Sequence, residues 1–192
     1  MKLVFATANQ NKTREIQDLI PSSIKILSLT DIHCSEDIPE TRATIEGNAS
    51  QKAFYVYEKY RHNCFADDTG LEIEALDGRP GVLSARYAGE NKNAVDNMNK
   101  ILAEMEGMTN RKARFKTVIS LVIDGQEVQF EGVIKGVILA KRQGDKGFGY
   151  DPIFLPDEYS KSFAEMDLSE KNKISHRALA VNKLVEYLKQ LQ

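Results

Sequence analysis

The chain has 192 residues, of which 42% are hydrophobic and 28% charged, the profile of one globular domain or of two small lobes that share a core. Lys plus Arg number 26 and Asp plus Glu number 28, so the net charge of −2 argues against a nucleic-acid partner, and an anionic ligand must meet local cations or a metal. No apolar run resembles a signal peptide or a membrane span, and Cys34 and Cys64 form no CxxC pair, so we expect a cytoplasmic protein with free thiols and no membrane partner.

The first half of the chain predicts alternating strands and helices. Short apolar runs indicate strands, and the third of them ends at the adjacent carboxylates Asp67 and Asp68. Helical spacing of apolar residues indicates two helices, and the irregular segment "SEDIPETRAT" (35–44), here called the acidic loop, lies before the second. The expected strands lie at 3–6, 24–29 and 64–66, and the expected helices lie at 12–20 and from residue 45 onward.

The second half predicts a further helix, a β-hairpin and a long final helix. Asp124-Gly125 between two apolar runs is a strong hairpin signal. Glycines then punctuate the segment "QGDKGFGYDP" (143–152), here called the glycine-rich loop, and Ser175 is a candidate N-cap of the final helix. Because strands and helices alternate early and a hairpin follows, the sequence predicts an α/β fold with a mixed sheet. The expected helices lie at 94–105 and 175–191, and the expected strands at 115–123, 128–134 and 137–140.

The segment "TANQNK" (7–12) has the features of a phosphate-binding loop. It joins a strand to a helix, and the N–H groups and positive dipole at a helix N-terminus favour anions. Thr7 and Asn9 add side-chain donors, and Lys12 adds a positive charge. The segment lacks the glycines of a Walker A motif, and an Asn-rich turn with a capping residue explains the same pattern.

Acidic residues offer the oxygen ligands that Mg²⁺ prefers. In the acidic loop we interpret Glu36 and Asp37 as solvated side chains and retain Glu40 as a candidate ligand. Asp67 and Asp68 follow an apolar run, and two like charges at its end repel unless a cation lies beside them. Either both aspartates point into water in an ordinary turn, or a cation holds them; in the second case Glu40, Asp67 and Asp68 would make a corner of three carboxylates for Mg²⁺.

Two later segments carry aromatic and cationic groups suited to a nucleotide. In the glycine-rich loop, Phe148 and Tyr150 alternate with glycines, so their rings are candidates for stacking on a base or for packing in the core. His176 and Arg177 open the final helix, and Lys171 precedes them. Basic side chains at a helix N-terminus oppose its dipole, which mildly favours a bound anion or an acceptor-rich ligand.

Five blocks in chain order resemble the inosine triphosphate pyrophosphatase (Ham1-like) family, and together they span essentially the whole chain. The blocks are "TANQNK", "NASQKA", "FADDTGLEIEALDGRPGVLSARYAG", "GFGYDPIF" and "EKNKISHRALA". The resemblance implies a single domain over 1–192 with an elongated α/β fold, in which helices flank a long mixed sheet and two lobes enclose a central substrate cleft. It also implies a homodimer that uses Mg²⁺ to hydrolyse the non-standard purine nucleotides ITP, dITP and XTP to the monophosphate and pyrophosphate, cleansing the nucleotide pool.

The resemblance implies roles for particular residues. Asp68 is matched to a metal ligand and general base, with Glu40 and Asp67 as further metal-binding carboxylates. Many relatives have Gly at position 8 and Ser at position 69; Thr69 keeps the hydroxyl, and Ala8 would narrow the phosphate loop. The residues matched to substrate binding are Thr7, Ala8, Asn9, Gln10, Asn11, Lys12, Lys52, Thr69, Phe148, Gly149, Tyr150, Asp151, Lys171, His176 and Arg177.

Hydrogen-bond polarity suggests how the base would be chosen. Hypoxanthine and xanthine present a carbonyl at position 6, which suits donors from Arg177 and His176, while Phe148 would stack on the ring. Adenine presents an amino group there and would leave donor facing donor. Two other classes stay open. One is a different phosphohydrolase or a phosphoacceptor domain that uses the aspartate pair, although "ADDTG" lacks the Asp-x-Asp-x-Thr spacing of a haloacid dehalogenase and no third aspartate ends a following apolar strand as in a receiver domain. The other is a nucleotide-binding module without turnover.

Overall fold

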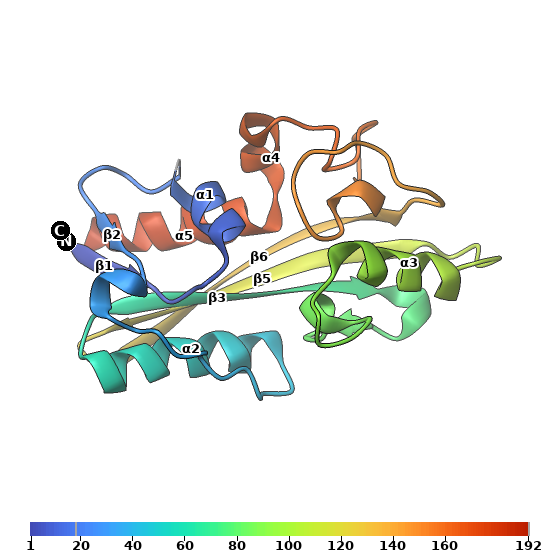
Figure 1. Cartoon of the computed structure of the whole chain (residues 1–192). Helices are drawn as coiled ribbons and strands as arrows, with labels where there is room; N and C mark the ends of the chain where they lie inside the picture. The colour runs from blue at the N-terminus through green and yellow to red at the C-terminus, as the bar shows by residue number, and fades with distance from the viewer. Residues whose placement is uncertain (18, 192) are drawn as a thin grey trace. The chain divides into compact units, whose positions relative to one another are not determined.

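A mixed β-sheet forms the centre of the fold in the computed structural model, which describes residues 1–17 and 19–191 (Figure 1). Its strands are β1 (Lys2–Phe5), β2 (Lys25–Leu27), β3 (Cys64–Ile73), β4 (Pro80–Gly81), β5 (Lys112–Ile123), β6 (Gln126–Ile138) and β7 (Phe154–Pro156). They follow the hydrogen-bonded order β2-β1-β3-β5-β6-β7, and β4 pairs with β3. β1 is parallel to β2 and β3, whereas the pairs β3–β4 and β6–β7 are antiparallel, so the predicted α/β fold with a mixed sheet is confirmed.

The helices begin where capping side chains predict helix starts. They are α1 (Gln10–Gln17), α2 (Ile45–Tyr60), α3 (Ala94–Glu104), α4 (Leu168–Ile174) and α5 (His176–Gln190). Before α2, Thr44 Oγ1 accepts a hydrogen bond from the N–H of Gly47 at 3.0 Å, and before α3, Asn93 Oδ1 accepts one from the N–H of Val95 at 2.8 Å. Among the described residues, no helix is both long enough and apolar enough to span a bilayer.

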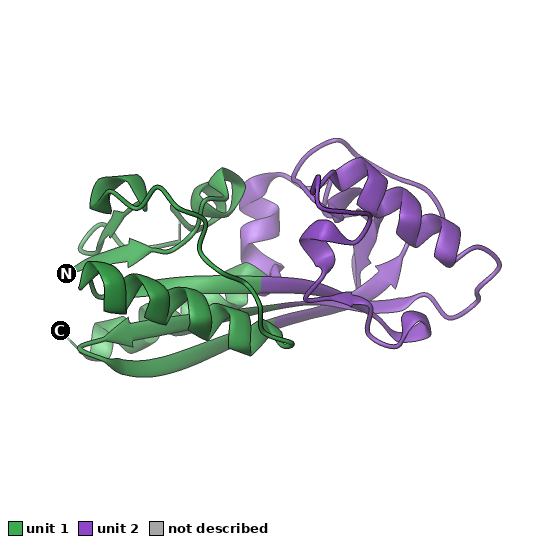
Figure 2. Cartoon of the chain, turned by 60° about the horizontal axis from the view of Figure 1, so that its bottom comes forward, with its two compact units in different colours: residues 1–68, 117–132, 177–192 green, residues 69–116, 133–176 purple. Residues whose placement is uncertain are grey.

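The chain divides into two compact units, and neither is a contiguous segment (Figure 2). Unit 1 comprises residues 1–68, 117–132 and 177–192, and unit 2 comprises residues 69–116 and 133–176. Strands β3, β5 and β6 each contribute residues to both units. Both units thus draw on distant parts of the chain, and the expected single domain over 1–192 and its central cleft stay predictions.

In unit 1, helices cover both faces of the sheet (Figure 1). Phe65 of β3 packs with residues of α1 and α5 in one buried cluster, whereas Cys64 and Ala66 pack with residues of α2 in another. This pattern follows from the strand itself, because successive side chains of a strand point to opposite faces. The next two residues of β3, Asp67 and Asp68, therefore face different helices.

Unit 2 has an apolar core of its own. Met98 and Ile101 of α3 pack there with Leu71 of β3 and with several aromatic rings. The ring centroids of Phe115 and Phe154 lie 4.7 Å apart in an edge-on arrangement, a favourable geometry for buried aromatic pairs. Tyr150, near the end of the glycine-rich loop, packs in this core, and the chain then continues into β7.

The predicted hairpin is confirmed, but its second strand is longer than expected. Asp124 and Gly125 both have positive φ angles, 50° and 80°, as the tight turn of a two-residue hairpin requires. The runs 128–134 and 137–140 were expected as separate strands, yet β6 is continuous to Ile138. Gly136 lies between the two runs because a Cβ there would lie 2.2 Å from the carbonyl oxygen of Leu155 on β7, so the glycine allows close pairing rather than a break.

Strand β3 also departs from expectation, since it runs through the aspartate pair to Ile73 instead of ending there. The cause is local charge compensation, because each aspartate lies beside a lysine of a different helix. The ends of α1 also differ from expectation, since it covers 10–17 where 12–20 was expected, whereas α5 begins at residue 176, directly after the expected N-cap Ser175. The elements α4 and β7 lie where the sequence indicated no helix or strand.

Candidate active site

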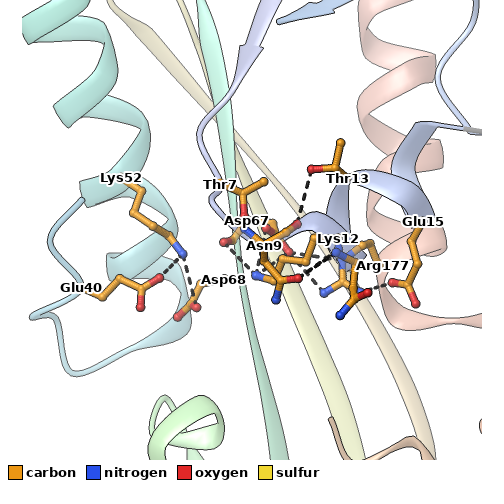
Figure 3. Close-up of polar contacts among 11 residues, drawn as sticks. Thr7, Asn9, Lys12, Thr13, Glu15, Glu40, Lys52, Asp67, Asp68 and Arg177 are labelled. Atoms are coloured by element: carbon orange, nitrogen blue, oxygen red, sulfur yellow. Dashed lines mark hydrogen bonds and ion pairs between the residues drawn. The ribbon is translucent and has the colours of Figure 1, made fainter. Parts of the chain in front are cut away.

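Asp67 is the centre of a buried charge cluster in unit 1 (Figure 3). Its side chain is 0% exposed, and Lys12 Nζ lies 3.0 Å from Oδ1 and 3.0 Å from Oδ2. Arg177 donates from Nε and Nη2 to Asp67 Oδ2 at 3.3 and 3.4 Å, and from Nη1 to Glu15. Burial opposes the charge of Asp67, but Lys12 and Arg177 outweigh this effect and lower its pKa to about 2. Asp67 is therefore an ionised side chain whose oxygens are used by buried cations.

Asp68 lies on the other face of β3, beside α2. Lys52 Nζ lies 3.6 Å from Asp68 Oδ1 and 2.5 Å from Glu40 Oε1, so one ammonium group joins the two carboxylates (Figure 3). Burial raises the pKa of Asp68 although Lys52 acts in the opposite direction. Burial also opposes the charge of Lys52, but the carboxylates of Asp68 and Glu40 outweigh it and raise the pKa of that lysine. The adjacent aspartates thus have opposite pKa shifts because they face different helices.

The predicted phosphate loop brings Lys12 to the Asp67 cluster, but Asn9 acts as a helix cap. Asn9 Oδ1 accepts hydrogen bonds from the N–H groups of Asn11 and Lys12 at 3.0 and 3.3 Å, and Thr7 Oγ1 accepts one from the N–H of Asn9 at 3.2 Å. The capped-turn interpretation therefore describes the structure of this loop. Phosphate binding here stays a prediction, and the exposed residues of the loop are Ala8, Asn9, Gln10 and Asn11.

The carboxylates around Lys52 suit Mg²⁺ better than Asp67 does. Asp68 Oδ2 is buried and has no hydrogen-bond partner among the described residues, so this oxygen is available to a ligand. Asp67 instead directs both oxygens at Lys12 and Arg177. Across residues 1–17 and 19–191, no group of three or more His, Cys, Asp or Glu side chains is placed to hold a metal. The expected corner of three carboxylates stays a prediction, in which Asp68 and Glu40 are better placed than Asp67, whose oxygens contact Lys12 and Arg177.

In unit 2, Lys171 and Asp151 form a buried ion pair at the glycine-rich loop. Lys171 Nζ lies 2.6 Å from Asp151 Oδ2, and the same oxygen accepts a hydrogen bond from the N–H of Phe148 at 2.8 Å. The ammonium group of Lys171 also lies 5.0 Å from the centroid of the Phe148 ring, within the range of a cation–π interaction. The structure thus brings together three of the predicted residues, from segments about 20 positions apart.

Tyr150 and His176 are core residues of unit 2 rather than exposed groups. Tyr150 is 5% exposed, and its hydroxyl donates to a backbone carbonyl at 2.7 Å. His176 is 3% exposed, and its ring stacks on that of Phe115 with the centroids 4.6 Å apart. Of the two interpretations of Tyr150, the structure therefore supports packing in the core over stacking on a base. Thr69 and Gly149 are half-buried, and their contacts with a substrate stay predictions.

Arg177 has partners that were not expected. It is 2% exposed, and its guanidinium group is directed at Asp67 and Glu15, so direct contact of Arg177 with a base stays a prediction. Sequence reasoning missed Glu15. Glu15 lies three positions after Lys12 and directly before Ile16, on the buried side of α1. An acidic residue among the apolar positions of a helix is the signal that would have indicated a buried ion-pair partner.

Comparison with known proteins extends over almost the full length of the chain. Residues 3–187 match the model of the Ham1 family. A Flavobacterium johnsoniae protein named dITP/XTP pyrophosphatase is 58% identical over 188 residues, covering 98% of both chains, and a Porphyromonas gingivalis protein of the same name is 51% identical over 188 residues, covering 97% of both. The structure of the Staphylococcus aureus Ham1 protein matches this fold with a TM-score of 0.92 at 36% identity, covering 100% of both chains. Sequence and fold agree from the first strand to the last helix, and the chain belongs to the Ham1 family.

Proposed function

We propose that the chain is a nucleoside triphosphate pyrophosphohydrolase that converts dITP, XTP and ITP to the monophosphate and pyrophosphate. The observation that carries the proposal is Asp68 Oδ2, a buried oxygen without a hydrogen-bond partner among the described residues, on the carboxylate that shares Lys52 with Glu40. Such an oxygen is costly unless a ligand or water binds it. The relatives named dITP/XTP pyrophosphatase support the substrate class.

Unit 1 supplies two lysines for the phosphate groups of the substrate. Because the chain as a whole carries a charge of −2, attraction for a polyanion must be local. Lys12 and Lys52 lie on opposite sides of β3, and each is held by an aspartate. An ammonium group has three N–H donors. Among the described residues Lys52 contacts the two carboxylates of Glu40 and Asp68, so we expect its further donor to bind a phosphate oxygen. Lys12 already contacts the backbone oxygen and both carboxylate oxygens of Asp67, so we expect it to exchange one of these contacts for phosphate.

Asp68 is the proposed proton acceptor of the reaction. Burial raises its pKa, which makes it a better base than an exposed aspartate. Asp68 would orient a water molecule and take its proton while the water oxygen attacks the α-phosphorus. The bond between the α-phosphorus and the bridging oxygen then breaks, and pyrophosphate leaves with that oxygen. Asp68 and Glu40 would hold Mg²⁺, which supplies charge stabilisation to the phosphates when it is bound.

Unit 2 supplies a candidate surface for a purine base. Phe148 is half-buried, so part of the residue is accessible, and the Lys171–Asp151 ion pair holds the backbone beside it. A rigid aromatic face of this kind suits stacking on a base. We propose that Phe148 binds the base and that Asp151 acts through its hydrogen bond to the Phe148 N–H.

The test is pyrophosphate release from dITP, XTP and ITP, with ATP and GTP for comparison, each with and without Mg²⁺. Asp68→Asn keeps the shape of the side chain but removes its basicity, so we expect kcat to fall by about 10²–10⁴-fold while nucleotide binding persists. Asp37→Asn, an exposed site in the acidic loop, is the matched control and should keep wild-type turnover. Near-normal turnover of Asp68→Asn would remove Asp68 from its role, and binding of dITP without pyrophosphate release by the wild type would favour a nucleotide-binding module.

A homodimer is proposed from family membership. Static light scattering of the full chain tests it directly, because a monomer of 21.6 kDa and a dimer differ twofold in mass.

A further inference from the structure

The acidic loop runs along α2 in the opposite direction to the helix and is bound to it at successive turns. At the C-terminal end of α2, the hydroxyl groups of Tyr60 and Tyr55 donate to Glu36 Oε1 at 2.6 and 3.0 Å, and Lys59 bonds to the same oxygen. Glu36 was interpreted as solvated; its side chain is 32% exposed, and Lys59, Tyr60 and Tyr55 also fix it to the helix and lower its pKa to about 2. The N-terminal part of the acidic loop is therefore anchored.

Two further side chains of α2 bind the residues that directly follow Glu40. Gln51 Oε1 accepts a hydrogen bond from the N–H of Thr41 at 2.9 Å, and Gln51 Nε2 donates to Thr41 Oγ1 at 3.0 Å. Asn48, which is 2% exposed, accepts a hydrogen bond from the N–H of Arg42 at 2.9 Å. Two consecutive backbone N–H groups of an irregular segment are thus bonded to one helix.

The end of the acidic loop is also pressed against the start of α2. A Cβ on Gly47 would lie 2.9 Å from Arg42 Cβ and 3.0 Å from Thr44 Oγ1, so only a glycine allows this close approach. Along the helix, the residues that bind the acidic loop recur three or four positions apart, which places them on one face. These residues are Asn48, Gln51, Lys52, Tyr55 and Lys59, and Tyr60 beside Lys59 adds a further bond.

We propose that Gln51 and Asn48 are positioning residues that hold Glu40 beside Lys52 and Asp68 and thereby set the affinity of this site for a divalent cation. The inference rests on the proposed function, in which Glu40 and Asp68 hold the cation. The ion pair between Glu40 and Lys52 uses the Glu40 carboxylate itself, so a cation that binds this carboxylate competes with the lysine. The hydrogen bonds of Gln51 and Asn48 instead use the backbone N–H groups of Thr41 and Arg42, which follow Glu40. They therefore hold Glu40 in place both when its carboxylate pairs with Lys52 and when it binds a cation.

The substitution Gln51→Met isolates this role. Methionine has a similar length and a similar helix propensity, but it cannot bond to Thr41. Groups that orient metal ligands from outside the coordination sphere typically change metal affinity by 10–100-fold when they are removed. Because Asn48 remains in Gln51→Met, we expect the dissociation constant for the cation to rise about 10-fold, at the lower end of that range. Gln190→Met, the same change at an exposed position of α5, is the matched control.

The experiment measures binding of Mn²⁺ alone to the full chain by electron paramagnetic resonance, with hydrogen exchange of the 36–44 segment and the Tm measured on the same samples. The proposal predicts weaker Mn²⁺ binding and faster exchange confined to this segment in Gln51→Met, with the Tm and the Gln190→Met control close to wild type. Unchanged Mn²⁺ affinity, faster exchange throughout the chain, or no Mn²⁺ binding by the wild type would each overturn it. Hydrolysis of dITP by the wild-type sample, measured alongside, shows separately whether the proposed function holds.

Discussion

Asp67→Asn tests whether the buried cluster of unit 1 depends on an ionised carboxylate. Asparagine has the same shape but carries no charge, so Lys12 and Arg177 would stay buried beside a neutral group. Removing one partner of a buried ion pair costs about 3–5 kcal/mol. In a chain of this length each kcal/mol lowers the Tm by about 2–4 °C, so we expect the Tm at neutral pH to fall by roughly 10 °C.

The buried charge cluster around Asp67 also predicts how the stability difference between wild type and Asp67→Asn depends on pH. The pKa of Asp67 falls from an ordinary 3.8 to about 2 in the folded chain. That change corresponds to about 2 kcal/mol of stability, which is the part of the expected cost that depends on the ionisation of Asp67. Because the folded pKa is depressed, this stability is present above the unfolded pKa and is lost as the pH falls through the folded pKa. The difference between wild type and Asp67→Asn should therefore be largest above about pH 5 and shrink toward about pH 2.

Urea denaturation across this pH range measures the unfolding free energy of both proteins. Asp157→Asn, at an exposed position of unit 2, controls for the loss of an aspartate elsewhere. The reasoning is refuted by an Asp67→Asn variant as stable as the wild type at neutral pH. A deficit that stays constant down to about pH 2 would refute it as well, because the deficit would then not depend on the ionisation of Asp67.

Two further predictions concern unit 2. Gly147→Ala would place a Cβ 2.1 Å from Asp151 Oδ2 at a φ of +71°, so we expect this variant to separate Asp151 from Lys171, to raise KM for dITP and to destabilise the fold. Gly149→Ala is the control for backbone strain alone, because its φ is +62° and nothing lies within 4 Å of the added Cβ. An equal loss in both variants would contradict the clash with Asp151. Tyr150→Phe removes the hydroxyl that donates to a buried carbonyl at 2.7 Å, so urea denaturation should show a loss of about 1 kcal/mol, and an unchanged midpoint would show that this bond adds nothing.

Features set by local pattern were predictable from the sequence. The hairpin at Asp124-Gly125 follows from the turn residues alone, and α2 and α3 begin where the apolar spacing predicted. No local pattern indicates the pairing of Lys52 with Asp68, and only the family resemblance placed both residues in one site.

Features set by distant partners were not predictable from one sequence. The two aspartates looked like the end of a strand because like charges are rarely placed inside one, and only the helices on the two faces show why β3 continues. Arg177 looked like a donor for a base, since nothing near it in the sequence indicates Glu15 as a partner. Likewise, the acidic composition of the 35–44 segment suggested solvation, whereas the side chains of α2 bind it.

The contact between Asp67 and Arg177 joins positions that are 110 residues apart, and this has a consequence for how the protein is made. At a ribosomal speed of about 5–20 residues per second, the carboxylate emerges roughly 5–20 s before its arginine. Throughout that interval β1 and β3 lack the helix α5 that packs against one of their faces. A chain that stops before residue 177 therefore lacks both the helix that covers this apolar face and the arginine that pairs with Asp67.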